Sequence, residues 1–183
     1  KTAYEIYQCD WSSDVCSSDL KTSVANALRR RFAKEHRKPI VLDGDIMRAI
    51  FDRVGSIGPA DRLALAWTYA RLCRELADQG FDVICATISM FEAVREWNRA
   101  SIPGYREIYL RVPHGERRAR DSKGLYSGDA AAEMLAFEQS AEEPLRPDLT
   151  IENFGAVCAE AAANRIWGEF FDIDTRVGTS PTG

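Results

Sequence analysis

Residues 39–48 read PIVLDGDIMR, and this stretch decides the fold class that the sequence predicts. An apolar run ends there at two aspartates that flank a glycine. Such a run is typical of a strand buried on both faces of a sheet, followed by the loop at its carboxyl end. Residues 81–89, FDVICATIS, repeat the pattern after an amphipathic helix over 61–80 that ends at Gly80. Strands that alternate with helices predict an α/β domain with a mostly parallel sheet and functional residues at the strands' carboxyl ends.

The rest of the chain continues the same alternation. Helices are expected at residues 21–38, 90–103 and 155–171, and strands at 105–113 and 149–153. Helices on both faces of a central sheet make three layers. We therefore expect one domain over residues 21–173 and a frayed tail over 174–183.

Residues 1–20 read unlike the rest and contain neither glycine nor proline. The strings KTAYEI and DWSSDVCSSDL resemble the translation, in one frame, of a common sequencing-library adapter; the alternative is a natural leader rich in serine and aspartate. We expect this adapter-like segment to be an artefact that replaces the first strand and a glycine loop of the domain. Because the segment holds one lysine and four carboxylates, the net charge of -4 becomes -1 without it.

Composition excludes several classes of protein. The chain has 183 residues, 45% hydrophobic and 28% charged, which suits one globular domain. Its charge argues against a protein that coats nucleic acid. No apolar run reaches the roughly 18 residues of a membrane span, and no signal-peptide pattern opens the chain. Five cysteines without paired or metal-type spacing favour a reducing compartment. We expect a cytoplasmic protein with neither a nucleic-acid nor a membrane partner.

Lys21 and Thr22 open the first expected helix of the domain and carry half of a motif. A phosphate-binding loop reads GxxxxGK[ST]: its N–H groups hold phosphate, its lysine reaches the β- and γ-oxygens, and its hydroxyl binds Mg²⁺. Here Val15 and Leu20 stand in the two glycine positions. A Lys-Thr pair alone carries no signal, but the adapter-like segment ends where the last glycine belongs. We expect Lys21 and Thr22 to be the remnant of such a loop, with Thr22 as the metal ligand.

Asp43 and Asp45 follow the first buried strand of the domain. One carboxylate can accept the proton of an attacking hydroxyl while the other orients the waters of Mg²⁺. Arg48 lies one helical turn beyond Asp45, in reach of an anionic acceptor, and Arg62 offers a second cation. The structural alternatives are a turn with a helix N-cap for the aspartates and solvated surface charges for the arginines.

Residues 118–126, RARDSKGLY, are dense in cations, and their lysine and glycine follow a short helix expected over residues 114–121. A loop of this kind can close over phosphates and exclude water. The alternative is an ordinary surface loop.

Together these motifs resemble, in order and spacing, the adenylyl-sulfate kinases. These are P-loop kinases that phosphorylate the ribose 3′-hydroxyl of adenylyl sulfate with MgATP. The resemblance covers roughly residues 21–165, and it rests on VLDGDIMR (41–48), ADQGFDVICATIS (77–89), RARDSKGLY (118–126) and EEPLRPDLTIEN (142–153). It implies a P-loop kinase-like three-layer fold, here with the first strand and glycine loop lost, and a homodimer as one possible assembly.

On the ATP side, the resemblance implies that Lys21 and Thr22 bind ATP and Mg²⁺ and that Arg120 lies near the adenine. Asp45 matches the carboxylate at the acceptor hydroxyl, with Asp43 beside it. Both are therefore expected to be catalytic.

On the acceptor side, the resemblance implies contacts from Arg48, Arg62, Ile88 and the flap lysine, Lys123. Ser89 matches the serine of the family's FISP segment, which is often labelled a phosphoserine intermediate. We interpret Ser89 as a hydroxyl of the acceptor site, because phosphoryl transfer needs no covalent step.

The sequence also departs from the family on the acceptor side. DGDN reads DGDI here, with Ile46, and FISP reads TISM, with Met90. In the helix that the family writes DRxENIRR, Leu65 replaces an asparagine and Trp67 an arginine. Losing an amide and a cation weakens recognition of a sulfated nucleotide.

Three functions remain open at this point. The first is adenylyl-sulfate kinase. The second is a kinase of the same family acting on another small hydroxylated acceptor. The third is a non-catalytic nucleotide-binding module, which the presence of Asp45, Arg48 and Lys123 disfavours.

Overall fold

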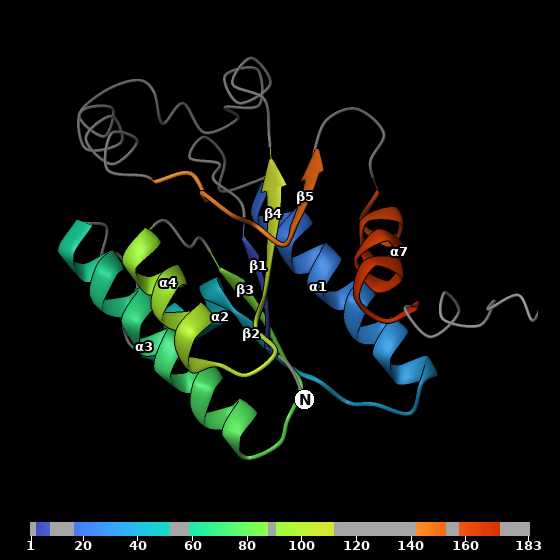
Figure 1. Cartoon of the computed structure of the whole chain (residues 1–183), viewed down its shortest axis with the longest axis horizontal. Coiled ribbons are helices and arrows are strands. Elements are labelled where there is room, and N and C mark those ends of the chain that lie inside the picture. Colours follow the sequence, from blue (N-terminus) through green and yellow to red (C-terminus); the bar gives the residue numbers. More distant parts are fainter. Residues whose placement is uncertain are drawn as a thin grey trace, which may run out of the picture.

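Within the described residues, a five-stranded sheet with every strand parallel to its neighbours forms the centre of the molecule (Figure 1). The computed structural model describes residues 3–7, 17–51, 59–87, 91–111, 142–152 and 158–172. The strands are β1 (Ala3–Tyr7), β2 (Ile40–Asp43), β3 (Val83–Thr87), β4 (Arg106–Arg111) and β5 (Leu149–Glu152). Their order across the sheet is β2-β3-β1-β4-β5, so β2 and β5 form the edges.

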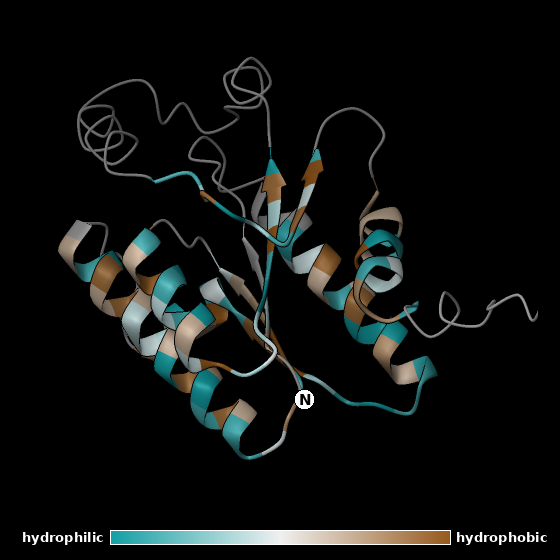
Figure 2. Ribbon diagram, viewed as in Figure 1, coloured by the Kyte–Doolittle hydropathy of each residue, from teal (hydrophilic) through white to brown (hydrophobic). Residues whose placement is uncertain are grey.

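Helices cover both faces of this sheet. They are α1 (Ser17–Lys34), α2 (Gly44–Ile50), α3 (Pro59–Asp78), α4 (Glu92–Ser101) and α7 (Ala159–Phe170). α1 and α7 lie side by side on one face, and α3 and α4 on the other (Figure 1). Figure 2 shows hydrophilic and hydrophobic residues alternating along the helices, as expected of helices with one buried side. The predicted three-layer α/β fold is confirmed.

Aromatic side chains fill the core between the sheet, α1 and α7. Phe32 meets Trp167 and Phe171 edge-on, with ring centroids 5.2 and 5.1 Å apart, and Trp167 stacks on Phe171 at 4.2 Å. Tyr4 of β1 packs against Phe32 at 5.7 Å and is buried. Rings in tilted and edge-on contact pack more favourably than their buried area alone implies.

β1 holds the central position of the sheet. It is formed by residues 3–7, inside the adapter-like segment, and pairs with both β3 and β4, so a strand occupies the place where the sequence predicts that the first strand is lost. The sequence AYEIY combines aromatic and β-branched residues, which suit a pleated strand. Without it, β3 and β4 would each leave a buried row of backbone N–H and C=O groups unpaired.

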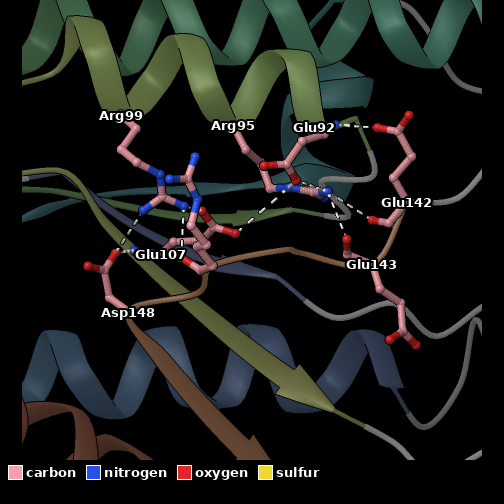
Figure 3. A network of polar contacts seen from close by, with 8 residues as sticks. Glu92, Arg95, Arg99, Glu107, Glu142, Glu143 and Asp148 are labelled. Carbon is pink, nitrogen blue, oxygen red and sulfur yellow. Dashed lines mark hydrogen bonds and ion pairs between the residues drawn. The ribbon is translucent and has the colours of Figure 1, made fainter.

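A buried arginine on α4 organises the opposite layer (Figure 3). Arg95 is fully buried and forms ion pairs with Glu92, at 2.6 Å, and with Glu107 of β4, at 3.7 Å. Its Nη2 also donates to the carbonyl oxygens of Glu142 and Glu143, at 3.0 and 3.4 Å. Arg95 therefore joins α4, β4 and the chain that leads into β5.

Arg99, one turn further along α4, extends the same network (Figure 3). It pairs with the buried carboxylate of Glu107 and, at 3.5 Å, with Asp148, and it donates to the carbonyl of Arg146 at 3.0 Å. The backbone N–H of Glu107 donates to Asp148 Oδ2 at 2.7 Å. Glu107 thus lies between two guanidinium groups, an arrangement in which removing one partner leaves an uncompensated buried charge.

Candidate functional site

Asp43 joins two helices at the carboxyl edge of the sheet. Its Oδ2 accepts a hydrogen bond from Thr22 Oγ1 of α1 at 2.5 Å. Its Oδ1 accepts from the backbone N–H groups of Asp45 and Ile46, at 2.9 and 3.3 Å, which makes it the N-cap of α2. The side chain is buried. The N-cap alternative is therefore correct for Asp43, and the same carboxylate also joins α2 to Thr22 of α1.

Asp45 is the exposed carboxylate of the pair. Its side chain is 58% exposed and forms an ion pair with Arg48, one turn further along α2. The sequence placed these two residues on one side of a helix, and the structure confirms that placement. Asp43 is buried and hydrogen-bonded to protein groups, whereas the Asp45 carboxylate is open to solvent.

Tyr69 of α3 is a site residue that sequence reasoning missed. Its hydroxyl donates to the carbonyl oxygen of Gly44 at 3.3 Å, directly between the two aspartates. Burial raises the pKa of Tyr69 to about 12, with Asp43 acting in the same direction and Arg48 against it. The only signal in the sequence was an aromatic residue at a core position of an amphipathic helix, which predicts packing rather than a polar contact.

Lys21 lies differently from its prediction. The helix expected to open at Lys21 begins at Ser17, so Lys21 is the fifth residue of α1. In an α-helix its backbone N–H points to the carbonyl four residues earlier and is no longer one of the unpaired amides of the helix start. Lys21 is buried, with 6% of the residue exposed. The helix start that would hold phosphate next to Lys21 in a glycine loop is therefore displaced by one turn.

The two acceptor-side departures on α3 have different surroundings. Leu65 packs against the hydrophobic cluster that contains Met47 of α2 and Tyr69. Trp67 instead meets Trp97 of α4 edge-on, with ring centroids 5.8 Å apart. Arg62 is half-buried, and its spacing from Leu65 and Tyr69 places it on the same side of α3. Leu65 therefore borders the α2 region, whereas Trp67 packs two helices together.

The remaining predicted site residues lie outside the described residues: Ile88, Ser89, Arg120 and Lys123, together with the flap at 118–126. Among the residues that the structure does describe, no group of three or more His, Cys, Asp or Glu side chains could hold a metal ion. None of the helices in the described part of the chain is long and apolar enough to cross a membrane.

Known proteins match this chain in both sequence and fold. The cytidine diphosphoramidate kinase of Campylobacter jejuni is 35% identical over 122 residues, covering 64% of this chain and 68% of that protein. The adenylyl-sulfate kinase of Paraburkholderia xenovorans is 34% identical over 136 residues, covering 72% and 76%. The APS kinase CysC of Mycobacterium tuberculosis, solved in complex with AMPPNP and APS, superposes with a TM-score of 0.71 at 23% identity, covering 91% and 96%.

The family model described as adenylylsulphate kinase matches residues 11–152, which include β2, α2, α3 and the network around Arg95. The match also takes in the last ten residues of the adapter-like segment. With the relatives above, it assigns the chain to a group of phosphotransferases: this protein belongs to the adenylylsulphate kinase family.

Proposed function

We propose that this protein transfers the γ-phosphoryl group of ATP to the 3′-hydroxyl of adenylyl sulfate. The observation that carries the proposal is the exposed Asp45–Arg48 pair beside a buried Asp43 that Thr22 contacts. The pair lies at the carboxyl edge of a parallel sheet, where α/β proteins bind their ligands. Family membership supports the reaction class.

Asp45 and Arg48 have different roles in this reaction: Asp45 accepts a proton, and Arg48 binds the anionic acceptor. The oxygen of the acceptor hydroxyl bonds to the γ-phosphorus while Asp45 accepts the proton of that hydroxyl. ADP leaves with the electrons of the broken P–O bond. Before the acceptor binds, Arg48 neutralises the charge of the Asp45 carboxylate through their ion pair. An anionic acceptor then competes for the guanidinium and leaves the carboxylate free to accept the proton.

Thr22 and Asp43 fit a magnesium ion. A hydroxyl and a carboxylate oxygen lie 2.5 Å apart between two helices, and both are oxygen donors, which Mg²⁺ prefers. Magnesium in phosphoryl-transfer sites takes one or two protein oxygens, with phosphates and water as its other ligands. When bound, it would neutralise charge on the phosphates. Lys21 and Arg120 complete the proposed ATP side, and Ile88, Ser89, Arg62 and Lys123 the acceptor side, on the strength of the family motifs.

One observation favours a second acceptor. A relative at 35% identity is a cytidine diphosphoramidate kinase, and Leu65 brings an apolar side chain to the α2 region where the family motif has an asparagine. The alternative is thus a kinase of the same mechanism whose acceptor is another hydroxylated nucleotide, such as a cytidine diphosphoramidate.

The two acceptors can be separated by kinetics. ATP-dependent phosphorylation of adenylyl sulfate and of cytidine diphosphoramidate would be measured side by side, with the chain as written and with a glycine loop restored before Lys21. We expect the restored chain to prefer adenylyl sulfate, and a Leu65→Asn variant to increase that preference. Turnover of the cytidine nucleotide alone would replace the first acceptor with the second.

A further inference from the structure

Helix α2 carries the proposed catalytic pair but has few contacts to hold it in place. It has seven residues, and a helix of that length is not stable by itself in water. Ile46 and Ile50 are 60% and 66% exposed, so much of its surface faces solvent. Met47 is the hydrophobic residue of α2 that is buried, and it packs in the hydrophobic cluster that also contains Tyr69. The orientation of α2 therefore depends on the residues that contact its ends.

Tyr69 contacts both ends of α2. Its hydroxyl donates to the carbonyl of Gly44, the first residue of the helix, at 3.3 Å. Its ring lies 6.4 Å from the ring of Phe51, the C-cap residue, with 34° between the planes. A single side chain from α3 thus contacts both the start of the helix, which Asp43 also caps, and its end, and the buried hydrophobic side chain between them is Met47.

We propose that Tyr69 is a positioning residue that holds α2, and with it Asp45 and Arg48, in the orientation that the acceptor requires. Gly44 directly precedes Asp45, so a shift of its carbonyl group would carry the Asp45 carboxylate with it. The raised pKa of the buried Tyr69 hydroxyl keeps it protonated, and therefore a donor, throughout the physiological range. The effect of Tyr69 on the acceptor rests on the proposed function; its effect on α2 does not.

The test compares Tyr69→Phe with Tyr105→Phe in the full chain. Both tyrosines are buried and border the same small cavity between α3, α4 and the sheet, so each variant removes one hydroxyl from a buried tyrosine of the same region. Amide hydrogen exchange would be followed over residues 44–51 and over α7, and binding of adenylyl sulfate by titration calorimetry. Since one hydrogen bond contributes a free energy equivalent to a factor of about 3–10 in an equilibrium constant, we expect Tyr69→Phe to raise exchange in 44–51 by that factor. We expect adenylyl sulfate affinity to fall by a similar factor, while exchange in α7 stays unchanged.

Tyr105→Phe should leave both readouts at their wild-type values. The proposal is overturned if Tyr69→Phe leaves exchange in 44–51 unchanged, if Tyr105→Phe raises it equally, or if exchange rises without any loss of affinity. A wild-type chain that does not bind adenylyl sulfate would contradict the proposed acceptor, and the exchange measurement would still decide whether Tyr69 holds α2.

Discussion

The first and second strand–helix junctions of this protein meet at the same edge of the sheet but differ in what precedes each helix. At the second, β2 ends at Asp43 and α2 begins at Gly44, with the Asp43 carboxylate as its cap. At the first, the sequence between β1 and Lys21 contains no glycine, and α1 begins at Ser17, one turn before Lys21. β1 pairs with β3 and β4 even though no glycine follows it before Lys21. A strand needs only a suitable pattern and free hydrogen-bonding neighbours, whereas phosphate binding needs a specific backbone path.

The hydrogen bond between Thr22 and Asp43 shows that the side chains of the two junctions still meet. We therefore expect the side chains of Thr22 and Asp43 to keep their pairing whatever sequence precedes Lys21. We propose that residues 1–20 are a replacement of the native first strand and glycine loop. On this view, Lys21, Thr22 and Asp43 retain the chemistry of an ATP site whose backbone cradle is missing.

Restoring the loop should give the largest effect. Val15 and Leu20 carry Cβ atoms where a phosphate-binding loop needs close backbone approach. We expect the chain as written to bind MgATP with a Kd above about 1 mM, and a chain with glycines at both positions in a native-type loop to reach about 1–10 µM, a gain of about 3–4 kcal/mol. Titration calorimetry would measure both, with Lys21→Ala in the restored chain as the control. Micromolar binding of MgATP by the chain as written would show that the glycines are dispensable.

The second effect concerns the other junction. In the restored chain, Asp45→Asn should lower turnover by about 10²-fold, because an amide cannot accept the acceptor's proton. Affinity for ATP should stay nearly unchanged, since the role of Asp45 is realised in the transition state. Asp43→Asn is the matched comparison: its carboxylate meets Thr22 and caps α2, so it should lower ATP affinity and stability as well. Near-normal turnover of Asp45→Asn would remove Asp45 from the mechanism.

The sequence predicted those strands and helices whose hydrophobic pattern matches the burial of their residues in the folded protein. The apolar runs at 40–43 and 83–87 form strands, and the two aspartates follow β2 as expected. β1 was not predicted, because residues 3–7 lie in the adapter-like segment. Glu107 was missed for a different reason: a charged residue in an alternating strand is expected on a solvated face, and only the tertiary arrangement of Arg95 and Arg99 makes its burial acceptable.

A third effect separates recognition from chemistry at the second junction. Arg48→Ala in the restored chain should weaken binding of adenylyl sulfate by about 1.5–3 kcal/mol, through loss of a charge-assisted pair. Turnover at saturating acceptor should change less, because the exposed Asp45 carboxylate remains. Steady-state kinetics that separate KM from kcat would measure this. A loss of kcat with unchanged KM would assign Arg48 to the transition state instead.

A fourth, smaller effect is a pH dependence of stability. The pKa of Tyr69 is raised to about 12 in the folded protein, above the ordinary value of about 10. The folded state keeps this proton where the unfolded chain has lost it, so the contribution is intact below pH 10 and is lost as pH rises through 12. At pH 11 the loss of this stabilising contribution amounts to about 1 kcal/mol. Urea unfolding at pH 8 and pH 11 should show a smaller loss for Tyr69→Phe than for the unaltered chain, and equal losses would contradict the assignment.

The smallest expected effect concerns Gly44, the glycine at the junction between β2 and α2. Unlike Gly80 and Gly104, Gly44 does not have a left-handed backbone, and a Cβ added there would lie 3.4 Å from the carbonyl oxygen of Ala86 and 3.5 Å from Thr87 Cα, which are ordinary contacts. An alanine would also lower the entropy of the unfolded chain at a helical position. We expect Gly44→Ala to change the free energy of unfolding by less than about 1 kcal/mol in either direction, as measured by urea denaturation. Because the two junctions differ in what their glycines do, the same substitution at either glycine of the restored loop should leave stability similar and remove ATP binding. A loss of several kcal/mol in Gly44→Ala would instead show that the second junction, too, depends on close backbone approach.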